Sequence, residues 1–182
     1  MAREITTHFH HIHHNGDCQR GFTLLELVFT VVIIGIVAAM AAPSFSGLIE
    51  SNKIKRLATE IEWLLVQAKS EAVMRGENVE VQVVVDGAGT PAWSIISRTT
   101  SGAITLAEVS SENFSNIELE TTFRTGMVTF NKLNGKPNLA GGYQFNIPTK
   151  DKVKVTVNTM TGRIYSCGVD GVVYGYKKCY SK

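Results

Sequence analysis

The sequence predicts an α+β protein in which a long N-terminal helix packs on an antiparallel β-sheet head. Three observations support this fold class. Residues 27–42 contain no charged side chain, residues 57–72 carry apolar side chains at helical spacing, and residues 79–176 hold short apolar runs separated by turns. Strands that follow one helix, without helices between them, are typical of an antiparallel sheet. The 182 residues suffice for one such domain and an anchor.

Residues 1–21 differ in composition from the rest of the chain. All five histidines and one of the three cysteines, Cys18, lie in this segment. A histidine cluster could bind a metal ion, but a leader that is removed from the mature protein is the simpler interpretation. We therefore expect a leader over residues 1–21 and no metal site in the protein.

The apolar segment from Phe22 to Ala42 is long enough to span a membrane. As a helix it extends about 31 Å, which is close to the hydrocarbon thickness of a bilayer. Glu26 lies inside this segment, where a carboxylate costs about 2.5–3.5 kcal/mol on insertion scales. The segment could be a secretory signal cut near Ala39-Met40-Ala41, or a plain signal anchor, but neither interpretation gives Glu26 a role.

The residues around Gly21 resemble the processing site of type IV pilins and type II secretion pseudopilins, over the stretch Arg20-Gly21-Phe22-Thr23-Leu24-Leu25-Glu26-Leu27. The resemblance implies that a prepilin peptidase cuts after Gly21 and methylates the new amino terminus of Phe22. It further implies that the apolar helix is retained, that Glu26 is the family's fifth-position glutamate, and that Pro43 is its helix-kinking proline. The implied partners are the prepilin peptidase, other pilins or pseudopilins, the inner-membrane assembly platform and the inner membrane.

Charge neutralisation gives Glu26 a physical role in this interpretation. The amine of an incoming Phe22 is cationic, and Glu26 of a neighbouring subunit could neutralise it. Each charge is costly alone in an apolar environment, and pairing lowers the cost of both. We therefore predict that Gly21 and Phe22 form the processing site, and that Phe22, Glu26 and Pro43 are assembly residues.

Beyond Pro43 the pattern stays helical but becomes amphipathic. Its apolar side chains fall on one side of the helix, which therefore needs a packing partner. Gly76 is a plausible helix end, so one helix is expected from Phe22 to about Arg75, bent at Pro43. Trp63 could either anchor a contact between subunits or pack against the sheet. The apolar stripe consists of Leu57, Ile61, Leu64, Leu65, Ala68 and Ala72.

The residues after the helix are expected to form the β-sheet head. Residues 79–85 and 93–96 can pair as a hairpin across the turn at 86–91, because the first run alternates apolar and polar side chains. The other expected turns are 134–137, 140–142 and 161–162. The expected strands are 79–85, 93–96, 104–109, 117–120, 127–131, 143–147, 153–157, 163–167 and 172–176.

Three later segments resemble the GspH/FimT branch of the same superfamily. They are residues 70–76, 130–137 and 155–163. The resemblance implies a pilin-like α+β fold and a minor pilin or pseudopilin. The expected parts are a leader (1–21), a transmembrane or filament-core helix (22–42), an amphipathic helix (43–76) and a β-rich head (77–182).

Two cysteines remain after the leader, Cys167 and Cys179. An even pair near the end of an exported chain indicates a disulfide, which would place the head outside the cytoplasm. The alternative is a pair of reduced thiols in a cytosolic protein.

Enzymatic activity is not expected. No histidine follows residue 21, so a histidine base, a histidine-containing nucleophile triad and a histidine-ligated metal are unavailable there. The sequence also lacks a Walker-type phosphate loop. A Ser-Lys arrangement remains open from the sequence alone. We expect neither a catalytic residue nor a cofactor.

Nucleic-acid binding is the alternative function. Some FimT-like minor pilins bind DNA in natural transformation through a Gly-Arg-x-Arg motif, whereas this chain has Gly162-Arg163-Ile164-Tyr165, with tyrosine at the second arginine. Tyrosines near the C-terminus could stack on bases. A solvated strand face and a soluble tail explain the same residues without a ligand. The candidate DNA-binding residues are Arg163, Lys152, Lys154, Lys177 and Lys178.

The sequence therefore predicts a single-pass inner-membrane protein with a periplasmic head that later enters a filament. The filament is either a type IV pilus or a type II secretion pseudopilus, and the subunit is expected near its tip. The alternative is a DNA-binding minor pilin for DNA uptake.

Overall fold

The computed structural model describes residues 21–85, 92–102 and 104–180, without the side chains of residues 41–44. The histidines, Cys18 and the expected turn at 86–91 lie outside the described residues. The chain divides into two compact units, Met1–Pro43 and Ser44–Lys182.

The first element is helix α1, Leu24–Arg75, which confirms the expected single helix. The Thr23 hydroxyl accepts a hydrogen bond from the Glu26 amide at 3.2 Å, so Thr23 satisfies one of the free amides at the helix start. Arg75 is followed by Gly76 with φ 64°, a left-handed conformation that glycine adopts without strain. A capping residue and a glycine therefore fix the two ends.

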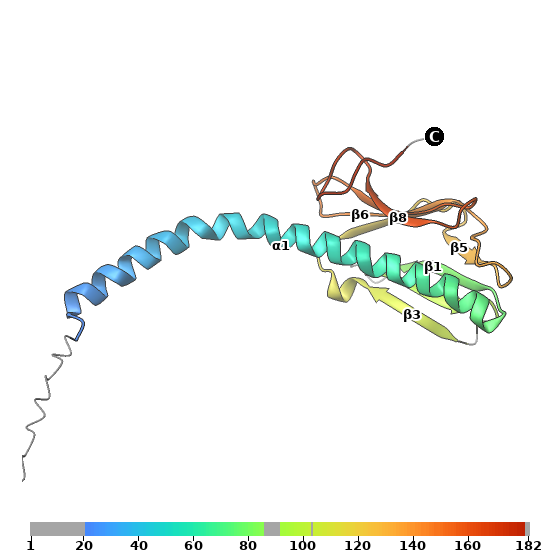
Figure 1. Ribbon diagram of the computed structural model, residues 1–182, viewed down its shortest axis with the longest axis horizontal. Coiled ribbons are helices and arrows are strands. Elements are labelled where there is room, and N and C mark those ends of the chain that lie inside the picture. Colours follow the sequence, from blue (N-terminus) through green and yellow to red (C-terminus); the bar gives the residue numbers. More distant parts are fainter. Residues whose placement is uncertain (1–20, 86–91, 103, 181–182) are drawn as a thin grey trace, which may run out of the picture. The chain divides into compact units, whose positions relative to one another are not determined.

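Within the described residues, eight strands form two four-stranded antiparallel sheets in the unit Ser44–Lys182. Sheet A has the order β3-β2-β1-β5, and sheet B has the order β4-β6-β7-β8. In Figure 1 the two sheets lie on two sides of the C-terminal part of α1. This arrangement confirms the α+β class. The strands are β1 (Val79–Val85), β2 (Trp93–Thr99), β3 (Thr105–Ser110), β4 (Glu118–Thr121), β5 (Met127–Phe130), β6 (Gly141–Asn146), β7 (Val153–Val157) and β8 (Ile164–Gly168), with a 3-10 turn at Ser111–Asn113.

The hydrophobic core among the described residues belongs entirely to the unit Ser44–Lys182. The expected apolar stripe of α1 is buried, with every member at most 3% exposed. Tyr143 of β6 links the two sheets, because its hydroxyl donates to the Val81 carbonyl of β1 at 3.2 Å. We therefore expect residues 44–182 to fold without the segment before them. The largest fully buried aromatic side chains are Tyr143, Phe114, Phe130 and Phe145.

Two local predictions are wrong. Residues 172–176 form no strand; Tyr174 and Gly175 both have positive φ, of 51° and 86°, and turn the chain between Val173 and Tyr176. Gly141 and Gly142, expected in a turn, open β6. A Cβ atom at Gly142 would lie 2.0 Å from the Val155 carbonyl oxygen, so the glycine permits close approach of β6 and β7 rather than a chain reversal.

Candidate functional sites

The segment of α1 before Pro43 exposes its apolar side chains. The large apolar side chains from Phe22 to Met40 are between 48% and 81% exposed. A helix that is apolar all round is stable only in an apolar environment, such as a membrane or a bundle of other helices. In the described part of the chain no single helix is long and apolar enough for a membrane span, whereas Leu24–Met40 and Phe45–Arg75 together pass on length and composition.

Glu26 is the acid of this segment and lies in the first turn of α1. The positive end of the helix dipole stabilises a carboxylate at this position. Glu26 takes part in none of the ion pairs between described residues. Gly21 and Phe22 precede the helix, and the Phe22 side chain is 80% exposed. The arrangement leaves the carboxylate available to a cation from another chain.

The second site is a cleft of about 490 Å³ on the C-terminal part of the head. It brings together Arg163, Lys177 and Lys178 of the predicted DNA-binding set. No carboxylate is among its lining residues within the described chain. The lining side chains include Tyr165, Tyr176 and Tyr180, and the Arg163 guanidinium lies over the Tyr165 ring at 5.5 Å. Cations and tyrosines without acids favour an anionic ligand with aromatic or apolar parts.

Lys152 and Lys154 are not among the residues that line this cleft. The Lys152 ammonium donates to Glu120 at 3.0 Å and is thereby paired. Lys154 lines a neighbouring hollow of about 480 Å³, which shares Tyr165 and Tyr180 with the cleft. Burial lowers the pKa of Lys154, because the charged ammonium is less well solvated there. Lys154 therefore lies in a hollow next to this cationic cleft, whereas Lys152 lines neither of the two.

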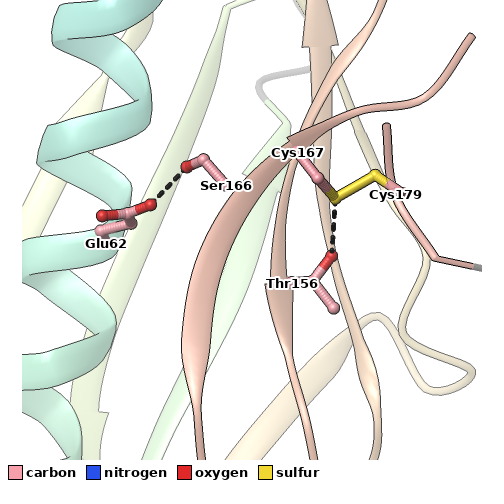
Figure 2. The surroundings of a disulfide bond; sticks show 5 residues. All are labelled: Glu62, Thr156, Ser166, Cys167 and Cys179. Carbon is pink, nitrogen blue, oxygen red and sulfur yellow. Dashed lines mark hydrogen bonds between the residues drawn. A yellow bond between two sulfur atoms is a disulfide. The ribbon is translucent and has the colours of Figure 1, made fainter. Parts of the chain in front are cut away.

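A disulfide joins Cys167 of β8 to Cys179 of the C-terminal tail, which confirms the predicted pairing. Figure 2 shows Cys167 next to Thr156 of β7, whose hydroxyl lies 3.7 Å from the Cys167 sulfur. On the other side of β8, the Ser166 hydroxyl donates to the Glu62 carboxylate of α1. Helix and tail are thus attached to opposite faces of the same edge strand.

Three groups around the cleft were not predicted. Asn158 and Thr161 line it from the turn before β8, where the Asn158 carboxamide oxygen accepts from the Thr161 amide at 3.0 Å. Glu62 contacts Ser166, and burial followed by the nearby Glu62 charge raises the pKa of Tyr176. The Asn-x-x-Thr spacing, which is typical of a turn, could have identified Asn158 and Thr161 from the sequence. No local sequence pattern identifies Glu62.

Trp63 does not pack in the core, because its side chain is 69% exposed. Of its two predicted roles, packing against the sheet is therefore wrong. Among the described residues, no group of three or more histidine, cysteine, aspartate or glutamate side chains could hold a metal ion.

Two family models match this chain. The prokaryotic N-terminal methylation motif matches residues 17–42, and the type II transport protein GspH matches residues 57–162. The chain belongs to the GspH family. This membership and the methylation motif confirm the predicted pilin and pseudopilin superfamily.

Individual proteins similar to this GspH-family chain include pilins. A fimbrial protein of Pseudomonas aeruginosa is 38% identical over 61 residues, 34% of this chain but only 39% of that protein. The type IV major alpha-pilin of Moraxella bovis is 28% identical over 159 residues, covering 85% of this chain and 88% of the pilin. The minor pseudopilin EpsH of the Vibrio cholerae type 2 secretion system aligns with 63% of this chain and 95% of its own, at 12% identity and a TM-score of 0.44.

Proposed function

We propose that this GspH-family chain is a minor pilin or pseudopilin whose leader, residues 1–21, is removed by a prepilin peptidase that methylates Phe22. Residues 22–42 then anchor it in the inner membrane and later lie in the core of a filament. Residues 43–76 form the amphipathic helix, and residues 77–182 form the β-rich head in the periplasm. The observation that carries the proposal is the exposed apolar helix with Glu26 in its first turn. Pro43 is proposed to kink the helix. The filament is proposed to lie on an inner-membrane assembly platform.

The mature amino terminus tests the processing step. Mass spectrometry of the purified protein is expected to find N-methylated Phe22 as the first residue. A chain that begins at Ala42 would indicate an ordinary secreted domain instead. An intact Met1 would indicate a plain signal anchor.

Assembly is tested at Glu26. Pairing of its carboxylate with the Phe22 amine of another subunit lowers the cost of two charges in an apolar environment. Glu26→Leu is therefore expected to leave cleavage after Gly21 intact and to abolish incorporation into sheared filaments. Glu108→Leu, the same substitution at an exposed position of β3, is the matched control and should incorporate normally. Normal incorporation of Glu26→Leu would refute the assembly role.

Two machines use such subunits, and a deletion separates them. Loss of protein secretion with intact pili indicates a type II pseudopilus, whereas loss of pili with intact secretion indicates a type IV pilus. In either machine we place the subunit near the tip, with a structural rather than an enzymatic role.

The cationic cleft supports a second function, DNA binding by the head. Arg163, Lys177 and Lys178 line one cleft with three tyrosines and no carboxylate. Phosphate contacts release counterions, so affinity should fall steeply with salt. We expect residues 44–182 to shift labelled DNA at low salt, and Arg163→Ala to weaken the shift. If no shift occurs at low salt, this second function is wrong and the filament role is unaffected.

A further inference from the structure

The cationic cleft is made of two chain segments. One half comes from the turn and strand before the first cysteine, with Arg163 and Tyr165 as its charged and aromatic groups. The other half comes from the tail around the second cysteine, with Lys177, Lys178 and Tyr180. The cleft exists only while these two halves lie together.

Few contacts hold the last described residues of the tail in place. The Gly168 amide donates to the Lys177 carbonyl at 2.9 Å, and the Cys179 amide donates to the Gly168 carbonyl at 2.8 Å. Lys177, Lys178 and Tyr180 are themselves exposed. Two backbone hydrogen bonds, which water can replace, do not offset the conformational entropy lost when such a segment is ordered. The Cys167–Cys179 bond supplies the remaining constraint.

The preceding part of the tail has its own anchor. Val173 is 6% exposed and packs in the core, and Val173 and Tyr176 exchange two backbone hydrogen bonds at 3.1 and 2.8 Å. Cleavage of the disulfide should therefore release the segment after Tyr176 while residues up to Tyr176 remain on the head. This segment carries two of the three cations of the cleft.

We propose that the cleft is a redox-conditional binding site for a single-stranded phosphodiester polymer, assembled only when Cys167 and Cys179 are joined. The proposal rests on DNA binding by the head, the second function proposed above, and adds that the redox state of the two cysteines controls this binding. The cations contact phosphates, and the tyrosine rings stack on unpaired bases, which a duplex does not present. The site would thus form only in an oxidising compartment.

The switch is a thiol–disulfide exchange with a dithiol protein or small molecule. Cys167 is 3% exposed and Cys179 is half-buried, so the attacking thiolate reaches the Cys179 sulfur and Cys167 leaves as a thiolate that takes up a proton. The second thiol of the dithiol then attacks its own mixed-disulfide sulfur and releases Cys179. Two electrons and two protons pass from the dithiol to the protein, and an oxidised dithiol reverses the reaction.

The test uses the mature chain, residues 22–182, in non-ionic detergent with a fluorescein-labelled oligodeoxythymidine as the probe. Fluorescence anisotropy compares the oxidised protein, the reduced and alkylated protein, and Cys167→Ser/Cys179→Ser. We expect oxidised protein to bind and the other two forms to bind at least about tenfold more weakly, since two phosphate contacts are lost. The slope of log K against log salt should become shallower by about 1.4. A duplex of the same length should bind the oxidised protein more weakly than the single strand.

A second variant keeps the test independent of the folding of the reduced protein. Lys177→Ala/Lys178→Ala retains the disulfide, and it should show the same loss of affinity and the same change of slope. Lys132→Ala/Lys136→Ala removes the same charge from a loop outside the cleft and should bind like the wild type. Hydrogen exchange should show that the Cys179 amide loses protection on reduction while the Val155 amide in β7 keeps it.

Each outcome decides between the proposals. Equal affinity of the oxidised and reduced proteins overturns redox control and leaves DNA binding intact. Equal affinity of Lys177→Ala/Lys178→Ala and the wild type removes the tail from the site and also overturns the inference. Equal or tighter binding of the duplex overturns the single-strand assignment. If the oxidised wild type does not bind at low salt, both the inference and the second function are wrong.

Discussion

The two parts of helix α1 differ in how their apolar side chains are arranged. Before Pro43 the large apolar side chains surround the helix and are 48–81% exposed, whereas between Ile54 and Ala72 most apolar side chains form one stripe that is at most 3% exposed, with Trp63 and Val66 exposed outside it. Apolar content alone therefore does not predict burial within the chain. A stripe can be covered by the head's own sheets, but an apolar surface on all sides needs a membrane or other subunits.

The largest expected effect comes from the same substitution, leucine to alanine, made separately in each of the two parts of α1. Leu65→Ala should lower the free energy of unfolding by about 2–5 kcal/mol, because it removes a fully buried side chain. Leu27→Ala, at a position that is 57% exposed, should change it by less than about 0.5 kcal/mol. Denaturant titration of residues 22–182 in detergent measures both. Similar losses would mean that the first part of α1 belongs to the head's core.

Gly142→Ala tests the close packing of sheet B. A Cβ at this position would meet the Val155 carbonyl oxygen at 2.0 Å, so we expect a loss of about 1–3 kcal/mol from backbone displacement. Gly171→Ala is the matched control, because no atom lies within 4 Å of its added Cβ. Thermal unfolding of residues 44–182 compares the two. Equal midpoints would contradict the close approach of β6 and β7.

Tyr143→Phe should cost about 1 kcal/mol, since it removes the hydrogen bond to the Val81 carbonyl. Burial raises the pKa of Tyr143 far above its usual range, so the folded head keeps this phenol protonated. Stability should be independent of this group below pH of about 10 and fall above it, where the unfolded chain loses the proton. Tyr143→Phe should reduce this alkaline loss. An unchanged alkaline profile would show that Tyr143 is not responsible.

The smallest effect is expected at the Lys152–Glu120 pair, whose side chains are 36% and 63% exposed. Lys152→Met should cost about 0.2–1 kcal/mol, and less at high salt, because water screens the pair. A double-mutant cycle with Glu120→Gln measures the coupling. This small coupling contrasts with the pair proposed for Glu26. An ion pair in an apolar filament core should decide assembly, because water does not screen it there. A large coupling at Lys152 would remove that contrast.

Much of the fold follows from local patterns. The capping threonine, the stripe from Leu57 to Ala72 and Gly76 specify α1, and the alternation in Val79–Val85 specifies β1. The predictions for Gly141-Gly142 and for residues 172–176 are wrong because they depended on composition where packing decides. Gly142 is needed for the close approach of Val155 on the neighbouring strand β7, and the tail turns at Tyr174 and Gly175 after Val173 has entered the core.

The candidate sites divide in the same way. The processing and assembly roles of Gly21, Phe22 and Glu26 remain predictions, which the sequence allows because the spacing of these residues along one segment is itself the signal. Among the DNA-binding candidates, Arg163 is predicted from its resemblance to a Gly-Arg-x-Arg motif, and the lysines are predicted from their charge. The fold brings Arg163, Lys177 and Lys178 together and pairs Lys152 with Glu120.

The sequence by itself determined the helix, the superfamily, the processing motif and the cysteine pair, because each depends on residues at fixed local spacing or on a count. Only the tertiary structure decided that the strands form two sheets, that Trp63 is exposed, and that Arg163 shares a cleft with the C-terminal tail. These features depend on contacts between segments far apart in the chain. Burial of the α1 stripe and the Cys167–Cys179 bond hold these segments together. The stripe and the cysteine pair are visible in the sequence, but the positions of the joined segments in space are not.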